Sequence, residues 1–122
     1  MVKCNVEKEK RKHPRAPADF GLRLNEIDRE TFATVVDISR AGVLCRSNRP
    51  FPPMTQVRIH LDLPVIKGSP LSATVDAEGA VVRCQMQSPT SPDPVYETAI
   101  FFTRLEDAPR AWIESYVLNR LS

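Results

Sequence analysis

Residues 57–63 read Val-Arg-Ile-His-Leu-Asp-Leu, and every second side chain in this stretch is apolar while the side chains between them are polar. Side chains of a β-strand alternate between the two faces of its sheet, so this pattern predicts a strand with one buried face and one wet face. Prolines 50, 52 and 53 come just before it and exclude continuous strand pairing there. The stretch indicates a sheet that covers a core on one side only.

Three earlier segments extend this sheet toward the amino terminus. Residues 20–24, Phe-Gly-Leu-Arg-Leu, alternate with the same period and predict a first strand. Residues 31–38 are rich in Thr, Val and Ile, and a Ser-Arg-Ala-Gly turn separates them from the apolar residues 43–45. These features predict two strands joined by a short connection.

The pattern continues downstream of residue 63. Leu71, Ala73 and Val75 alternate, and Gly79 precedes the apolar-rich residues 80–84, which predicts two strands with a bend near the glycine. Residues 88–94 combine Ser, Pro and Asp and predict an exposed, mobile loop. Residues 96–102 predict a last strand, and its largely apolar second half indicates burial on both faces.

Helical spacing occurs only at the carboxyl end. Asp107 is suited to cap a helix and Pro109 to occupy its first turn, and apolar residues then recur at helical spacing: Trp112, Ile113, Tyr116, Val117 and Leu121. These side chains are expected to pack on the sheet. Many short antiparallel strands followed by one helix predict an all-β fold with one helix, in which the sheet closes into a barrel and leaves no exposed edges.

Length and composition limit the class of protein. A chain of 122 residues with 42% hydrophobic and 26% charged residues is typical of one globular domain. No window has the roughly 18 apolar residues of a membrane span, and residues 1–15 contain no apolar segment of a secretory signal. We therefore expect a cytoplasmic protein without membrane insertion.

Cysteine usage agrees with that compartment. The three cysteines, Cys4, Cys45 and Cys84, include no C-x-x-C pair, so reduced thiols are expected, with Cys45 and Cys84 in the core.

Motifs of common enzyme classes are missing from the sequence. It contains no P-loop, G-x-G-x-x-G, G-x-S-x-G or H-E-x-x-H pattern. Neither histidine, His13 or His60, pairs with an evident nucleophile. His60 and Asp62 share a strand face, but two ligands do not specify a metal site. We expect a protein that is not an enzyme and has no metal or cofactor.

Positive charge is concentrated at the amino terminus. Residues 1–15 hold six Lys or Arg against two Glu, a net charge of +4, while the whole chain carries +2. This asymmetry predicts a flexible basic arm over residues 1–18 and a barrel domain with its helix over residues 19–122. A basic arm on a slightly acidic body indicates an anionic partner captured at one end, although a solvated tail alone also explains such a run.

Two motifs accompany this arm in chain order. Arg11 and Arg15 form an R-x-x-x-R motif before the first strand, and residues 37–42, Asp-Ile-Ser-Arg-Ala-Gly, form a D-x-S-x-x-G motif at the strand-to-strand turn. In this combination the chain resembles the PilZ family of cyclic di-GMP receptors over roughly residues 8–121. The resemblance implies a six-stranded antiparallel PilZ-type β-barrel with a carboxy-terminal helix. One departure is Ala99, since family members often have Gly in the last strand.

The resemblance implies a cyclic di-GMP site at these motifs, and the residue types suit that ligand. Arginine forms bidentate bonds to the guanine O6/N7 edge or to phosphate, so Arg11 and Arg15 are assigned to these groups and Lys10 to background charge. The Asp37 carboxylate can accept from the guanine N1 proton and the exocyclic amine. Three further assignments complete the expected site: Ser39 as a small donor and acceptor, Gly42 as a residue that lets the ligand approach closely, and Arg40 as a phosphate contact.

Other interpretations remain open at this point. Asp, Ser and Gly are favoured in ordinary turns, so residues 37–42 can be a turn without a ligand. A PilZ-like scaffold that works only through protein contacts is one alternative function. A small nucleic-acid-binding barrel is another, which the scarcity of aromatic residues suited to stacking disfavours. As a cyclic di-GMP receptor, the chain is expected to act on an unidentified effector protein in motility or biofilm regulation.

Overall fold

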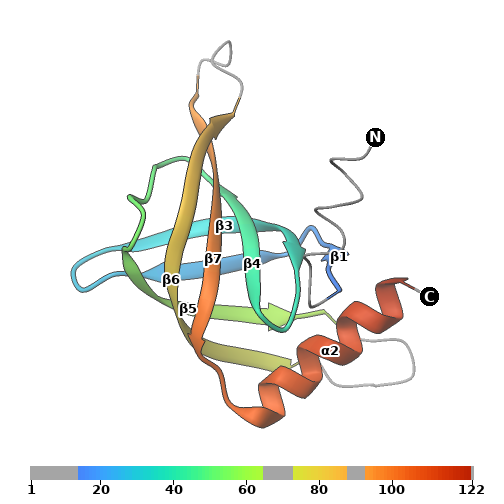
Figure 1. The fold of residues 1–122 in the computed structure, drawn as a ribbon. Coiled ribbons are helices and arrows are strands. Elements are labelled where there is room, and N and C mark those ends of the chain that lie inside the picture. The colour runs from blue at the N-terminus through green and yellow to red at the C-terminus, as the bar shows by residue number, and fades with distance from the viewer. Residues whose placement is uncertain (1–13, 65–72, 88–92, 122) are drawn as a thin grey trace, which may run out of the picture.

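The computed structural model describes residues 14–64, 73–87 and 93–121 (Figure 1). Seven strands and one helix lie within these ranges: β1 (Ala16–Pro17), β2 (Gly21–Asn25), β3 (Glu30–Ile38), β4 (Gly42–Ser47), β5 (Gln56–Leu63), β6 (Ala73–Gln87), β7 (Val95–Arg104) and α2 (Asp107–Leu121).

The six longer strands form a closed antiparallel barrel. Neighbouring strands pair in the order β3, β2, β5, β6, β7 and β4, and a further pairing between β3 and β4 closes the sheet on itself. The short strand β1 adds to the end of β3, where Ala16 pairs with Ile38 and Pro17 with Asp37. Closure gives the backbone groups of the six strands partners on both sides. The predicted fold class is confirmed.

The core fills the inside of this barrel. On β5 the alternation predicted from residues 57–63 is observed, since Val57, Ile59, Leu61 and Leu63 are each at most 3% exposed. The largest fully buried side chain is Phe51, which lies in the proline-rich connection before β5. Sequence periodicity had not identified Phe51, because a single aromatic residue between prolines has no period.

Helix α2 packs across one end of the barrel beside β1 (Figure 1). Ile113, Tyr116 and Val117 are buried there, and the Tyr116 ring meets the Phe20 ring edge-on at 5.5 Å between centroids. Trp112 and Leu121 were also expected to pack on the sheet, but they are 40% and 52% exposed. Only the side of the helix that carries Ile113, Tyr116 and Val117 is buried, so the buried stripe of α2 is narrower than its apolar pattern.

The segment around Gly79 differs from its prediction. A single strand, β6, runs from Ala73 to Gln87 in place of two strands with a bend, while Leu71 lies outside the described residues. The register against β7 shifts at Glu78/Gly79 and again at Val81/Arg83. A β-bulge bends a strand without ending its pairing, which explains how one long strand follows the curved barrel wall.

The second half of β7 is likewise not buried on both faces. Ile100 and Phe102 are 2% and 8% exposed, but Phe101 between them is 55% exposed. No second layer covers the outer face at this strand among the described elements, so the period of two persists through an entirely apolar run. The prediction of two-sided burial was therefore wrong.

Cysteine positions partly match expectation. Cys45 is fully buried and Cys84 is only half-buried, and both are free thiols. Cys4 and most of the predicted loop, residues 88–92, lie outside the described residues. The one described helix is too short and too polar to cross a membrane.

Burial of Cys45 predicts an alkaline loss of stability. Desolvation, assisted by the neighbouring Cys84 thiol, raises the pKa of Cys45 to about 12. The unfolded chain releases this proton near pH ~8.5 while the folded chain retains it, so the free energy of unfolding falls as pH rises above that value, by up to about 1.4 kcal/mol per pH unit. Urea titrations from pH 7.5 to 10 measure this slope, and a Cys45→Ala variant is expected to flatten it. A native slope equal to that of the variant would contradict the assignment.

Candidate functional site

Strand β1 brings the two sequence motifs together at one end of β3. Because Pro17 pairs with Asp37 in the β1–β3 register, Arg15 lies beside the carboxylate that begins the D-x-S-x-x-G motif. The distance from Arg15 Nη1 to Asp37 Oδ1 is 3.9 Å, and the two side chains are 35% and 25% exposed. Ala16 is fully buried and fixes this segment of the predicted arm against the barrel. Lys10 and Arg11 lie outside the described residues.

The turn from Ser39 to Gly42 is held by its own hydrogen bonds. The Ser39 N–H donates to the Gly42 carbonyl oxygen at 2.9 Å, and the Ser39 hydroxyl accepts from the Ala41 N–H at 3.1 Å. Ser39 is 4% exposed. Its hydroxyl therefore has a structural task in the turn, and the O–H proton remains available to a further acceptor.

Gly42 is required by the approach of a neighbouring strand. A Cβ atom at this position would lie 2.3 Å from the Ile100 carbonyl oxygen of β7, far inside contact distance. This close approach of the β4 and β7 backbones is a structural reason for glycine at this position, and the expected role of Gly42 in making room for a ligand stays a prediction. The sequence could not show this approach, because Ile100 is 58 residues away.

Arg40 points toward α2. Its Nη1 donates to Glu114 Oε2 at 3.0 Å, and both side chains are a little over 40% exposed. Arg110, also on α2, donates to the Arg40 carbonyl oxygen at 3.4 Å and to the Leu105 carbonyl oxygen at 2.8 Å. The candidate site is thus connected to the helix by two arginines. Sequence reasoning missed Glu114 and Arg110, since nothing local links a helix to a turn 70 residues earlier.

A small hollow of about 60 Å³ lies between this turn and the helix, lined by Pro14, Arg40, Glu114, Val117 and Leu118. It adjoins the Arg15 segment through Pro14.

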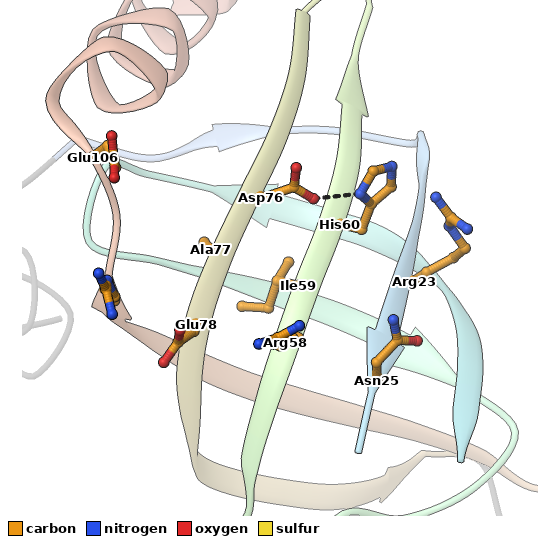
Figure 2. Close-up of a pocket in the computed structure, with 10 residues that line it drawn as sticks. Arg23, Asn25, Arg58, Ile59, His60, Asp76, Ala77, Glu78 and Glu106 are labelled. Carbon is orange, nitrogen blue, oxygen red and sulfur yellow. Dashed lines mark hydrogen bonds and ion pairs between the residues drawn. The ribbon is translucent and has the colours of Figure 1, made fainter. Parts of the chain in front are cut away.

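A larger hollow, of about 540 Å³, lies on another face of the barrel across β2, β5 and β6 (Figure 2). There His60 Nδ1 pairs with Asp76. Asp62, which shares a strand face with His60 but does not line this hollow, accepts from the Thr74 hydroxyl at 2.7 Å. Positive and negative side chains line this hollow in balance, among them Arg58 and Glu78. No group of three metal-ligating side chains occurs in the described ranges.

The chain forms a small β-barrel. At one end of β3, Arg15, the Asp37 carboxylate and the tight turn that follows at Ser39 come together. The PilZ domain model matches residues 9–119, so this chain belongs to the PilZ domain family. A comparison with curated protein sequences finds no significant match.

Two solved structures share the fold. The inhibitor of motility MotI/DgrA of Bacillus subtilis superposes with a TM-score of 0.76 at 16% identity over 92% of this chain. The PilZ domain of YcgR from Escherichia coli, determined with c-di-GMP, gives a TM-score of 0.71 at 8% identity over 92% of both chains. This chain spans about half (51%) of the MotI/DgrA chain.

The approach of β7 to Gly42 gives a stability prediction. In a Gly42→Ala variant the new methyl group meets the Ile100 carbonyl oxygen, and overpacking of this kind costs about 1–3 kcal/mol of unfolding free energy. Gly21→Ala is the matched control, because its Cβ would lie 3.8 Å from the Ala33 carbonyl oxygen, an ordinary contact. Urea denaturation of both variants checks this, and equal midpoints would contradict it.

Proposed function

We propose that this chain is a cytoplasmic receptor for cyclic di-GMP that passes the binding signal to an effector protein. The observation that carries the proposal is the placement of Arg15 beside Asp37, 3.9 Å apart, in a chain of the PilZ domain family. Support also comes from the shared fold of the YcgR domain, whose structure contains c-di-GMP. The role is binding and signal transmission, not catalysis.

The contact between Arg15 and Asp37 suits exchange with a ligand. At 3.9 Å it is a long ion pair between partly exposed groups, which contributes little stability, so ligand groups can replace it at small cost. The Arg15 Nε is buried and has no hydrogen-bond partner among the described residues. A phosphate or a guanine O6/N7 edge would accept from the Arg15 guanidinium, and the guanine N1–H and N2–H groups would donate to the Asp37 carboxylate.

The remaining residues of the proposed site act around this pair. Arg11 and Lys10 lie outside the described residues; Arg11 is proposed to bind a guanine edge or a phosphate of the ligand, and Lys10 to add positive charge beside it. Ser39 keeps the turn in shape and offers its O–H proton to the ligand.

Transmission to the effector is proposed to run through α2. Arg40 occupies the site turn, and its partner Glu114 belongs to the helix. Ligand phosphates would compete with Glu114 for the Arg40 guanidinium, and this competition would loosen the helix at the turn. Such coupling requires that the ligand bind the two arrangements with different affinity.

The central test is calorimetric titration with cyclic di-GMP, comparing the native protein with Arg15→Ala. Loss of a charge-assisted hydrogen bond costs about 1.5–3 kcal/mol, so affinity should fall at least tenfold while the melting temperature stays nearly unchanged. Arg23→Ala is the matched control, because Arg23 forms a similar ion pair with Glu30, at 3.7 Å, outside the motifs. Its affinity should equal that of the native protein.

Three results would contradict the proposal or its assignment of Arg15. Undiminished affinity in Arg15→Ala would remove Arg15 from the site. A native protein that releases no heat with cyclic di-GMP would favour the protein-interaction scaffold, and steeply salt-dependent binding of long oligonucleotides would favour a nucleic-acid-binding barrel.

A second test concerns base selectivity. If Asp37 accepts from the guanine N1 and N2 protons, the native protein should discriminate against cyclic di-AMP, which lacks this donor pair, and Asp37→Ala should lose most of that discrimination. The ratio of the two dissociation constants measures the effect in each protein. Equal binding of both dinucleotides by the native protein would exclude this role for Asp37.

A further inference from the structure

Strand β6 is longer than the part of the barrel wall to which it belongs. It pairs with β5 over residues 73–80, while its pairing with β7 continues to Gln87. One further contact follows on the β5 side, where the N–H and the carbonyl oxygen of Val81 both bond to the connection that precedes β5. Beyond Val81, β6 and β7 run on together past the start of β5 (Figure 1).

Residues 82–87 therefore form an open strand edge. Within the described ranges, no backbone group bonds to this side of β6 after Val81. An open edge presents a row of N–H and C=O groups that can pair with another strand. The barrel was expected to leave no exposed edge, and this stretch departs from that expectation because β6 extends beyond its neighbour β5.

The sequence of this edge does little to prevent pairing. Natural edges are commonly protected by Pro, by charged side chains or by a bulge that twists the edge away. Residues 82–87 read Val-Arg-Cys-Gln-Met-Gln, with no Pro and a single charge at Arg83. The bulge lies at the start of the stretch, and the register against β7 is regular from Arg83 to Gln87. Five consecutive residues thus offer a regular edge.

The two faces of this edge differ in character. Cys84 pairs with Thr98, which is fully buried, so Cys84 and Met86 lie on the core face of the sheet. Met86 is nevertheless 56% exposed. The outer face carries the alternate residues: Arg83, Gln85 and Gln87. An added strand would therefore meet an apolar side chain on one face and polar side chains on the other.

We propose that a second copy of this chain binds here, with its β6 edge antiparallel to the first about a two-fold axis at Gln85. Two-fold symmetry pairs a surface with itself, so one self-complementary edge is enough to form a closed dimer. An axis at Gln85 pairs all five regular residues, with Arg83 opposite Gln87 and Cys84 opposite Met86. The result is one continuous sheet through β4, β7 and β6 of both copies.

Charge and packing both suit a second copy as the occupant. The two Arg83 side chains lie four residue rises apart along the strands, roughly 13 Å, so like charges do not face each other. On the core face, Cys84 of each copy lies beside Met86 of the other and covers its exposed surface. Pairing of this kind buries apolar side chains on the core face and leaves the polar residues of the outer face in water.

The antiparallel arrangement also keeps the two barrels apart. Each β6 leaves its own barrel wall at Val81, four residues before the axis at Gln85. The two barrel walls are therefore about eight residue rises apart along the strands, roughly 26 Å, at opposite ends of the shared ribbon.

Sedimentation velocity of the full chain, with a thiol reductant and without cyclic di-GMP, tests the proposal. The native protein should show a monomer–dimer equilibrium as its concentration is raised. Gln85→Lys places two like charges opposite each other at the axis, so the dissociation constant should rise about fivefold or more while the melting temperature is retained. Gln56→Lys is the matched control, because Gln56 is also exposed but lies on β5, where it pairs with Ala80. Its dimerisation should equal that of the native protein.

Charge complementation then locates the contact. Gln85→Glu alone should also weaken the dimer, whereas an equimolar mixture of Gln85→Lys and Gln85→Glu should associate at least as tightly as the native protein, because opposite charges then face each other. A native protein that stays monomeric at every concentration overturns the proposal. A dimer that neither charge variant weakens, or that the mixture does not restore, overturns it as well. Titration with cyclic di-GMP is independent of these results, since the dimer uses no residue of the candidate site.

Discussion

The pairing of β3 with β4 is the constraint on which the rest of the structure depends. It joins the two ends of the sheet into a barrel. It also requires a tight reversal of the chain at Ser39–Ala41, where the Ser39 N–H donates to the Gly42 carbonyl oxygen. The reversal is possible because Gly42 lets β4 approach β7, where any Cβ would collide with the Ile100 carbonyl oxygen. The turn that closes the barrel is also the turn of the candidate site, so fold closure and site geometry share the same residues.

Barrel closure also fixes the orientation of every outward side chain near the site. Once the inward residues of β3, β4, β7 and β6 fill the core, the residues between them face solvent in rows. The register shifts between Val35 and Asp37 on β3 and between Val81 and Arg83 on β6, and a bulge of this kind redirects the side chains beside it. Asp37 and Arg83 follow two of these bulges, whereas the β2–β5–β6 face carries outward side chains of both charges.

Much of the architecture could be predicted because burial imposes a short period on the sequence. The alternation at residues 57–63 became β5, and the helical spacing after Asp107 became α2. The predictions failed where an apolar run does not imply burial. Phe101 and Trp112 are apolar and yet exposed, since each lies on a face that no other described element covers. Gly79 marked a bulge in one strand, because pairing to β7 continues on both sides of it.

The sequence by itself determined the period of each strand, the basic arm, the two motifs and the family resemblance, because these depend on residue type and short spacing. Only the tertiary structure decided that Arg15 meets Asp37, that Arg40 is paired with Glu114, and that Gly42 serves the approach of β7. Each of these contacts joins residues that the barrel register brings together from different strands or from the helix. Strand register and bulge position are set by packing of the whole core, and no local stretch of sequence contains them.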